Sequence, residues 1–348
     1  MIAINGLGRI GRLTVRRLAR THGAGLCALN DPADLDTLVH LLRHDSVHGG
    51  DRPPVAGLRR AGQDFLRLEG CEIPLFHEPD PARIPFPDCG ARLVVEASGR
   101  FTARAAAARH LKGPVGHVII SAPSPDADLT VIHPFNGHLL DPRVHRVVSN
   151  ASCTAHATAP LLDVLQRSFG FQAAGMSTVH VVTNDQRLLD HPHPDPRRAR
   201  AAFQNIIPTT SSAFGALHRA LSLPPGFDGW ALRVPCLAVN LVDLTAVLDR
   251  DADPDAIAEA FRAAARGRLR GILGISEAPL VSHDFIDREE SVILDPRLTR
   301  VVDGRLVKVF GWHDNEVGYA ARLCELVTVL GSALDDAPAG GQGDGQDG

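Results

Sequence analysis

Short apolar runs of strand length alternate with longer runs of helical periodicity over the first 150 residues of the chain. The expected strands are residues 1–5, 25–30, 92–96 and 117–121, and the expected helices follow the first strand to about residue 20 and occupy 34–43 and 102–111. Alternation of this kind is typical of a doubly wound, mostly parallel sheet with helices on both faces. The pattern therefore predicts an α/β domain over residues 1–150.

The hydrophobic pattern changes after residue 150. Residues 156–170 have helical periodicity, 181–208 form a long segment without apolar periodicity, and Val and Leu alternate along 232–248. Strands with one buried face and one solvated face favour an antiparallel arrangement, and a long irregular segment in a compact domain is often functional. We expect a second, α+β catalytic domain over residues 151–315, with a mostly antiparallel sheet.

The C-terminal part returns to a helical pattern. A helix is expected over residues 316–333, where it would complete the first domain, and the Gly/Asp/Gln/Pro-rich tail 337–348 is expected to be disordered. A chain of 348 residues agrees with two domains of ordinary size.

A glycine motif follows the first strand. Residues 6–11 read G-x-G-x-x-G between a strand and a helix, which is the context that a dinucleotide-binding loop needs. Gly6 permits the tight turn, Gly8 lets the backbone approach a pyrophosphate, and Gly11 lets the helix pack on the strand. Glycines also serve ordinary turns, but Asp31 lies 20 residues beyond Gly11, where a carboxylate accepts ribose hydroxyls. The sequence predicts a Rossmann domain that binds NAD rather than NADP.

Composition argues against several other classes of protein. The net charge is −4, so the composition does not indicate a basic surface for nucleic acid. The hydrophobic fraction of 44% is enough for substantial cores. The apolar runs look too short for a membrane span, and the glycine loop begins too early for a signal peptide. The six cysteines lack zinc-binding spacing, and His191 and His193 lie in a proline-punctuated loop, so we expect no metal site. A cytoplasmic small-molecule enzyme is expected.

One cysteine and one histidine stand out as a candidate catalytic pair. Cys153 lies within Ser149–Thr154, just before a predicted helix, and His180 follows 27 residues later. A thiolate is the reactive form of cysteine, and a nearby imidazole and a helix N-terminus both favour it. These residues predict thiol-based oxidation of an aldehyde, with a thiolate–imidazolium pair as the activated state.

The chain resembles the phosphorylating glyceraldehyde-3-phosphate dehydrogenase family, nearly collinearly from Met1 to about Leu330. The segments that carry the resemblance include INGLGRIGR, HDSVHG, EASGRF, SNASCT, STVH, TNDQ, NIIPT, ALRVP, SHDF and WHDNEVGYA. The resemblance implies that Cys153 attacks the aldehyde of glyceraldehyde 3-phosphate, that hydride passes to NAD, and that inorganic phosphate releases the thioester as 1,3-bisphosphoglycerate. It also implies a homotetramer.

The resemblance further assigns binding roles to individual residues. It implies cofactor contacts for Arg9, Ile10, Asp31, Ser98, Ser121 and Asn315. It implies contacts to the substrate phosphate for Thr183 and Arg233, and to the attacking phosphate for Ser152, Thr154, Ser211 and Ser212, with added charge from Arg197. Asn315 could instead be a turn former, and the arginines at 197, 198 and 200 could instead form a solvated or subunit-facing basic cluster.

Departures from the family pattern leave other functions open. The usual Thr-Thr-Asn-Cys after the catalytic cysteine is Thr-Ala-His-Ala here, which removes a second thiol and adds His156. Ser212 replaces a glycine, and Val317 stands where tryptophan is usual. The alternatives are the same chemistry on erythrose 4-phosphate or a specialised aldehyde or acceptor such as arsenate, an inhibitor-resistant paralogue, and a non-catalytic NAD-binding regulatory paralogue.

Overall fold

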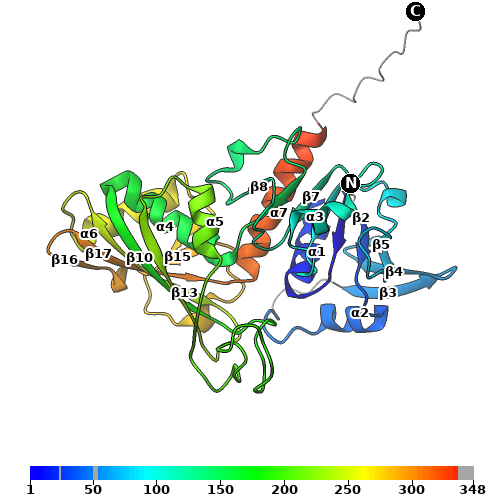
Figure 1. Ribbon diagram of the computed structural model, residues 1–348, viewed down its shortest axis with the longest axis horizontal. Coiled ribbons are helices and arrows are strands. Elements are labelled where there is room, and N and C mark those ends of the chain that lie inside the picture. Colours follow the sequence, from blue (N-terminus) through cyan, green and yellow to red (C-terminus); the bar gives the residue numbers. More distant parts are fainter. Residues whose placement is uncertain (23–24, 50–53, 336–348) are drawn as a thin grey trace, which may run out of the picture.

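The protein contains two β-sheets that lie on either side of a long C-terminal helix (Figure 1). The computed structural model describes residues 1–22, 25–49 and 54–335. The tail that the sequence predicts to be disordered, 337–348, lies outside the described residues.

The first sheet has nine strands in the order β3-β4-β5-β2-β1-β6-β7-β9-β8. Its strands are β1 (Ile2–Asn5), β2 (Leu26–Asn30), β3 (Val55–Arg60), β4 (Gln63–Leu68), β5 (Cys71–Phe76), β6 (Leu93–Glu96), β7 (His117–Ile120), β8 (Leu129–Thr130) and β9 (Val147–Ser149). The pairs from β5 through β8 are all parallel, as the sequence predicted for this domain. Helix α1 (Arg9–His22) follows β1, and α2 (Leu35–Arg43) follows β2 with Asp34 as its N-cap.

Two features of the first sheet differ from the expectation. Strand β4 pairs antiparallel with β3 on one side and with β5 on the other, and neither β3 nor β4 was predicted. The helix expected over 102–111 is only α3 (Arg104–Ala107), followed by a 3-10 turn at Ala108–His110. That turn brings the buried His110 Nε2 to 2.8 Å from Glu96 Oε2, a tertiary contact that helix propensity does not encode.

The second sheet has eight strands, seven of them in the order β11-β12-β10-β13-β17-β15-β14, with β16 paired to β17. They are β10 (Phe171–His180), β11 (Ile207–Thr209), β12 (Gly226–Arg233), β13 (Asn240–Leu248), β14 (Leu273–Ile275), β15 (Val292–Leu294), β16 (Arg300–Val302) and β17 (Leu306–His313). Most pairs are antiparallel, as expected, although β10–β12 and β14–β15 are parallel.

Helices cover one face of the second sheet. Helix α4 (Cys153–Phe169), α5 (Ala213–Ala220) and α6 (Pro254–Arg266) share one apolar core with the inward residues of β10, β13 and β17. Helix α4 begins three residues earlier than the expected 156–170 because the Ser152 hydroxyl caps it. This cap makes Cys153 the first residue of the helix.

Helix α7 (Val317–Asp335) runs between the two sheets and joins the core of the first one (Figure 1). Leu323, Leu326 and Leu330 pack with Val15 and Leu18 of α1. By length and composition alone, Val317–Leu334 could cross a membrane, which corrects the expectation that the apolar runs are too short. More than half of that stretch is buried inside the protein, which is the pattern of a core helix.

Candidate active site

The turn between β9 and α4 presents the candidate nucleophile. Ala151 adopts a left-handed conformation with φ of 52°, and Ser152 Oγ accepts a hydrogen bond of 3.1 Å from the Ala155 N–H. Cys153 therefore lies at the N-terminus of α4, where the unpaired amides of the first turn carry partial positive charge.

His180 ends β10 beside this turn. Its Nε2 lies 3.6 Å from Cys153 Sγ, and its Nδ1 lies 2.8 Å from the carbonyl oxygen of Val181. A carbonyl only accepts, so Nδ1 carries the ring proton and donates it to Val181. That tautomer leaves Nε2 free to accept the thiol proton.

The electrostatics of the pair combine opposing effects. Burial raises the pKa of the Cys153 thiol, whereas the Arg233 guanidinium and the Thr154 hydroxyl lower it. Burial and then Arg233 hold the pKa of His180 well below its ordinary value. Burial thus opposes formation of the thiolate–imidazolium pair, whereas the cation of Arg233 favours the thiolate. The ion pair therefore stays a prediction.

Arg233 ends β12 and pairs in register with His180 on the adjacent parallel strand. Its Nε and Nη1 are buried and have no hydrogen-bond partner among the described residues. Burial lowers the pKa of Arg233 to about 10. An unpaired buried guanidinium is costly unless an anion completes it, so this position fits a phosphate or carboxylate of a ligand.

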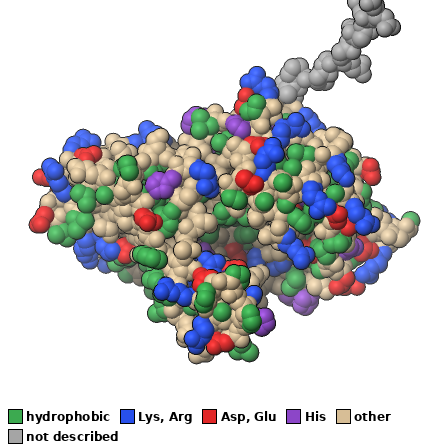
Figure 2. Space-filling view, viewed as in Figure 1, with side chains coloured by type: hydrophobic (Ala, Val, Ile, Leu, Met, Phe, Trp, Pro, Cys, Tyr) green, Lys and Arg blue, Asp and Glu red, His purple; other side chains and the backbone are tan. Residues whose placement is uncertain are grey.

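A cavity of about 810 Å³ opens beside the pair. Its walls include eight of the residues singled out by sequence: Arg9, Ile10, Ser121, Ser152, Cys153, His180, Thr183 and Asn315. Figure 2 shows a recess where the two halves of the molecule meet, above the projecting loop that follows β10. The cavity is large enough for a small substrate beside part of a cofactor.

Buried polar atoms in this cavity match the nicotinamide end of a dinucleotide. Asn315 Oδ1 and Ser121 Oγ are buried, and neither has a hydrogen-bond partner in the described part of the chain. The first is an acceptor and the second can donate or accept, which suits a carboxamide. Arg9 Nη1 donates to Asp45 and its Nε donates to Glu316, so the guanidinium itself is engaged. The first-turn amides at Arg9 and Ile10 remain suited to a pyrophosphate.

A second, smaller cavity of about 190 Å³ lies at the glycine loop and includes Asp31 and Ser98 in its wall. A Cβ at Gly8 would meet no atom within 4 Å, whereas one at Gly6 would lie 2.5 Å from the Ser98 backbone. The space over Gly8 is therefore open to a ligand rather than filled by the protein. Asp31 is fixed beside it, because its carboxylate accepts from the Leu7 N–H at 2.7 Å. These residues fit NAD.

Most of the residues expected to bind the attacking phosphate lie outside the walls of the two cavities. Thr154, Ser211, Ser212 and Arg197 do not contribute to the walls of either cavity, and neither does Arg233, which is expected to bind the substrate phosphate. Ser212 has φ −69° and ψ −9°, a right-handed conformation open to any residue, so replacing glycine there adds no backbone strain. Ser211 Oγ accepts from the Ala213 N–H at 3.2 Å.

Among the arginines of the loop after β10, Arg198 is the one whose charge acts on His180, and the role expected for Arg197 stays a prediction. The Arg197 side chain is exposed, whereas Arg198 donates to Asp185 at 2.6 Å and to Thr209 Oγ1 at 3.0 Å. The charge of Arg198 also contributes to lowering the pKa of His180. Adjacent arginines in an irregular loop carry no periodicity that says which one points inward, so the sequence could not separate them.

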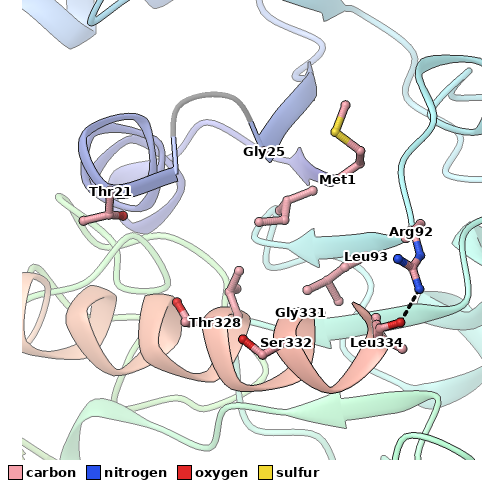
Figure 3. Close-up of a pocket in the computed structure, with 11 residues that line it drawn as sticks. Met1, Thr21, Gly25, Arg92, Leu93, Thr328, Gly331, Ser332 and Leu334 are labelled. Atoms are coloured by element: carbon pink, nitrogen blue, oxygen red, sulfur yellow. Dashed lines mark hydrogen bonds between the residues drawn. The ribbon is translucent and has the colours of Figure 1, made fainter. Parts of the chain in front are cut away.

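Two other features lie apart from this site. A cavity of about 420 Å³ between the N-terminus and the end of α7 is lined by Met1, Leu93 and Gly331, and Arg92 there donates to the Leu334 carbonyl (Figure 3). It contains none of the residues singled out by sequence. The ligand atoms of His48, Asp287 and Asp314 lie within 4.8 Å of one another, but His48 already bonds Asp287 at 2.9 Å, so ion pairing accounts for this cluster.

Comparisons with known proteins cover almost the whole chain. Residues 1–104 match the family model described as "Glyceraldehyde 3-phosphate dehydrogenase, NAD binding domain", and residues 152–315 match "Glyceraldehyde 3-phosphate dehydrogenase, C-terminal domain". The chain is 45% identical over 334 residues to "Glyceraldehyde-3-phosphate dehydrogenase 1" of Bacillus cereus, which covers 95% of this chain and 98% of that protein.

Similar values hold for two further relatives. "Glyceraldehyde-3-phosphate dehydrogenase" of Geobacillus stearothermophilus is 43% identical over 95% of this chain and 98% of its own length. The protein of the same name from Streptomyces coelicolor is 42% identical over 96% of this chain and 99% of its own length. The similarity therefore extends across both sheets and the helix between them.

Proposed function

Because the chain belongs to the glyceraldehyde-3-phosphate dehydrogenase family, we propose that it oxidises glyceraldehyde 3-phosphate to 1,3-bisphosphoglycerate with NAD and inorganic phosphate. The observation that carries the proposal is the 3.6 Å contact of Cys153 Sγ with His180 Nε2. Beside it lies Arg233, whose buried Nε and Nη1 have no hydrogen-bond partner among the residues that the structure describes. This arrangement places a nucleophile and a base in the wall of one cavity, with a candidate anion site on the strand next to the base.

Covalent attachment of the aldehyde comes first. Cys153 Sγ attacks the aldehyde carbon, forming a carbon–sulfur bond as its proton leaves and the aldehyde oxygen gains one, to give a hemithioacetal. The Cys153 N–H at the start of α4 stabilises the developing oxyanion. Arg233 and Thr183 bind the substrate phosphate, which orients the aldehyde carbon toward the sulfur.

Oxidation and release follow at the same sulfur. Asn315, Ser121 and Asp31 would hold NAD, which would supply the acceptor for the hydride of the hemithioacetal carbon. His180 Nε2 takes the hydroxyl proton at that moment, so that a thioester remains on Cys153. An oxygen of inorganic phosphate then attacks the thioester carbonyl, the carbon–sulfur bond breaks, and the acyl phosphate leaves with the thiol restored. We expect Ser152, Thr154, Ser211 and Ser212 to bind this phosphate, with added charge from Arg197 or Arg198.

The other readings of the sequence receive less support. Near full-length similarity to proteins named for the three-carbon substrate favours it over erythrose 4-phosphate or a specialised aldehyde. The relaxed backbone at Ser212 removes one reason to expect a different acceptor. A regulatory paralogue without turnover would not need the aligned Nε2 of His180, whose orientation the Val181 carbonyl maintains.

Assembly as a homotetramer is also proposed. The face of the second sheet that α4 leaves uncovered carries exposed apolar side chains at Trp230, Val247 and Leu306. An apolar face of this kind commonly packs against a second copy of the chain. Light scattering coupled to size exclusion measures the mass directly, and a fully active monomer would contradict the tetramer.

A cytoplasmic location is proposed as well, and its support comes from the cysteines. All six are free thiols in the structure. Free thiols persist in reducing compartments. Fractionation of the cells that make the protein checks this, and recovery outside the cytoplasm would contradict it.

Initial-rate assays of NADH formation at 340 nm test the proposed activity. We expect rapid, phosphate-dependent turnover of glyceraldehyde 3-phosphate, slower turnover of erythrose 4-phosphate, and arsenate able to replace phosphate. A preference for the four-carbon sugar would reassign the substrate. An absence of NADH with either aldehyde, in protein that binds NAD, would sink the proposal.

A further inference from the structure

The turn that presents the nucleophile is held in an unfavourable conformation. Ala151 is fully buried and has φ of 52°, a left-handed conformation that costs a residue with a Cβ more than it costs glycine. Cys153 begins α4 two residues later, so relaxation of Ala151 would move the start of the helix and the thiol with it. The surrounding structure must therefore stabilise this conformation.

Two side chains hold the carbonyl groups of this turn. His156 Nε2 lies 3.1 Å from the carbonyl oxygen of Asn150, and the Tyr319 hydroxyl lies 3.4 Å from that of Ala151. The two rings meet edge to face, with centroids 5.9 Å apart. One side chain comes from the first turns of α4 and the other from α7, so two helices converge on the turn.

His156 acts as a neutral donor across the working pH range. Burial lowers the pKa of His156 to about 3, and the nearby cation of Arg322 contributes in the same direction. The hydrogen bond to the Asn150 carbonyl raises the pKa only in part. Since a carbonyl only accepts, the single ring proton resides on Nε2 and is donated to Asn150. The buried Nδ1 has no hydrogen-bond partner within the described ranges.

His156 does not itself reach the reaction space. It is 2% exposed and is not part of the cavity wall, whereas Ala151, Ser152 and Cys153 are. Its polar contact is with the backbone behind the nucleophile. An effect on the reaction must therefore pass through the turn.

We propose that His156 is a positioning residue: by donating to the Asn150 carbonyl it stabilises the left-handed Ala151 turn and thereby directs Cys153 Sγ toward His180 Nε2. The expected effect on turnover rests on the proposed function. The expected effect on the position of the Cys153 thiol does not depend on the proposed function.

Replacement of His156 by leucine or by glutamine tests the role. Leucine removes the donor, whereas the glutamine amide places an N–H about as far along the side chain as Nε2. We expect His156→Leu to lower kcat about 10- to 100-fold with KM for the aldehyde and Kd for NAD within about threefold, because a nucleophile out of line slows the chemical step. His156→Gln should restore kcat to within about threefold of the parent.

Alkylation of Cys153 by iodoacetamide at pH 8 gives a readout that does not need the substrate. The leucine variant should react at least about fivefold more slowly than the parent, and the glutamine variant at nearly the parental rate. Parental kcat and alkylation in His156→Leu would overturn the proposal. The proposal would also be overturned if His156→Gln lost as much kcat and alkylation rate as His156→Leu. That result would mean that packing of the imidazole ring, and not its hydrogen bond, holds the turn.

If His156→Leu does not fold, His156→Gln alone tests the proposal. In that case a folded glutamine variant within about threefold of the parent in kcat and alkylation supports the proposal, and one more than about tenfold slower contradicts it. If the parent turns over neither aldehyde, the proposed function fails, while the alkylation rates still report whether His156 positions the thiol.

Discussion

His48 Nε2 lies 2.8 Å from Glu316 Oε2, which joins the loop after α2 to the residue that precedes α7. On its other side His48 Nδ1 lies 2.9 Å from Asp287 Oδ1, in the turn that follows the 3-10 segment Ser282–Phe285 between β14 and β15. Glu316 also accepts from Arg9 at the start of α1. A buried histidine thus bridges carboxylates from separate parts of the chain, next to the asparagine expected to bind nicotinamide.

This bridge predicts a pH-dependent contribution to stability. Burial lowers the pKa of His48, but the hydrogen bond to Glu316 and the charge of Asp314 outweigh it, so the net pKa is raised. A raised pKa means that the contribution is full below the unfolded value of about 6.5 and is lost as pH rises through the folded value. We expect His48→Gln to cost about 1.5–3 kcal/mol at pH 6 and clearly less at pH 9.

Thermal unfolding at the two pH values measures the effect. The exposed His44 supplies the matched control, and His44→Gln should change the midpoint little at either pH. A loss in His48→Gln that is equal at pH 6 and pH 9 would show that the imidazolium does not contribute.

The thiol of Cys153 is predicted to be necessary for turnover. We expect Cys153→Ala to form no NADH above background, since no other group can carry the thioester, and to retain NAD binding. Steady-state rates and fluorescence titration with NAD measure the two properties. Cys236→Ala removes an exposed thiol as the control and should keep the parental rate. Measurable phosphate-dependent turnover in Cys153→Ala would contradict the mechanism.

Arg233 is predicted to bind the substrate phosphate and to favour the thiolate. Its cation lowers the pKa of Cys153, so Arg233→Leu should move the pH midpoint of Cys153 alkylation upward. Loss of a charge-assisted contact should also raise KM for the aldehyde by about 10- to 100-fold. Alkylation across pH 6–10 and initial rates give both values. Arg143→Leu removes an exposed arginine as the control, and an unchanged KM in Arg233→Leu would remove Arg233 from the anion site.

Asp31 is predicted to exclude NADP. Its carboxylate is anchored by the Leu7 and Ala33 N–H groups beside the glycine-loop cavity, where it would repel a 2′-phosphate. We expect Asp31→Asn to lower the ratio of kcat/KM for NAD over NADP by about tenfold, corresponding to roughly 1.4 kcal/mol. Rates with both cofactors measure this ratio. A ratio that stays constant would locate the discrimination in another residue.

The local elements were largely predictable from sequence, because they depend on short-range patterns. The glycine loop, the parallel strands around β1 and the terminal helix α7 follow from periodicity and turn chemistry. The pairing of Cys153 with His180 was also anticipated, since two reactive side chains in the family's motifs left few alternatives.

The sequence by itself determined which residues carry the chemistry, and the tertiary structure decided how they are held. That Arg198 rather than Arg197 is held by Asp185 and Thr209 depends on contacts across an irregular loop. The left-handed Ala151 has no local signal, because alanine does not favour that conformation and the hydrogen bonds that surround it come from α4 and α7. Such contacts join distant parts of the chain, so only the folded molecule specifies them.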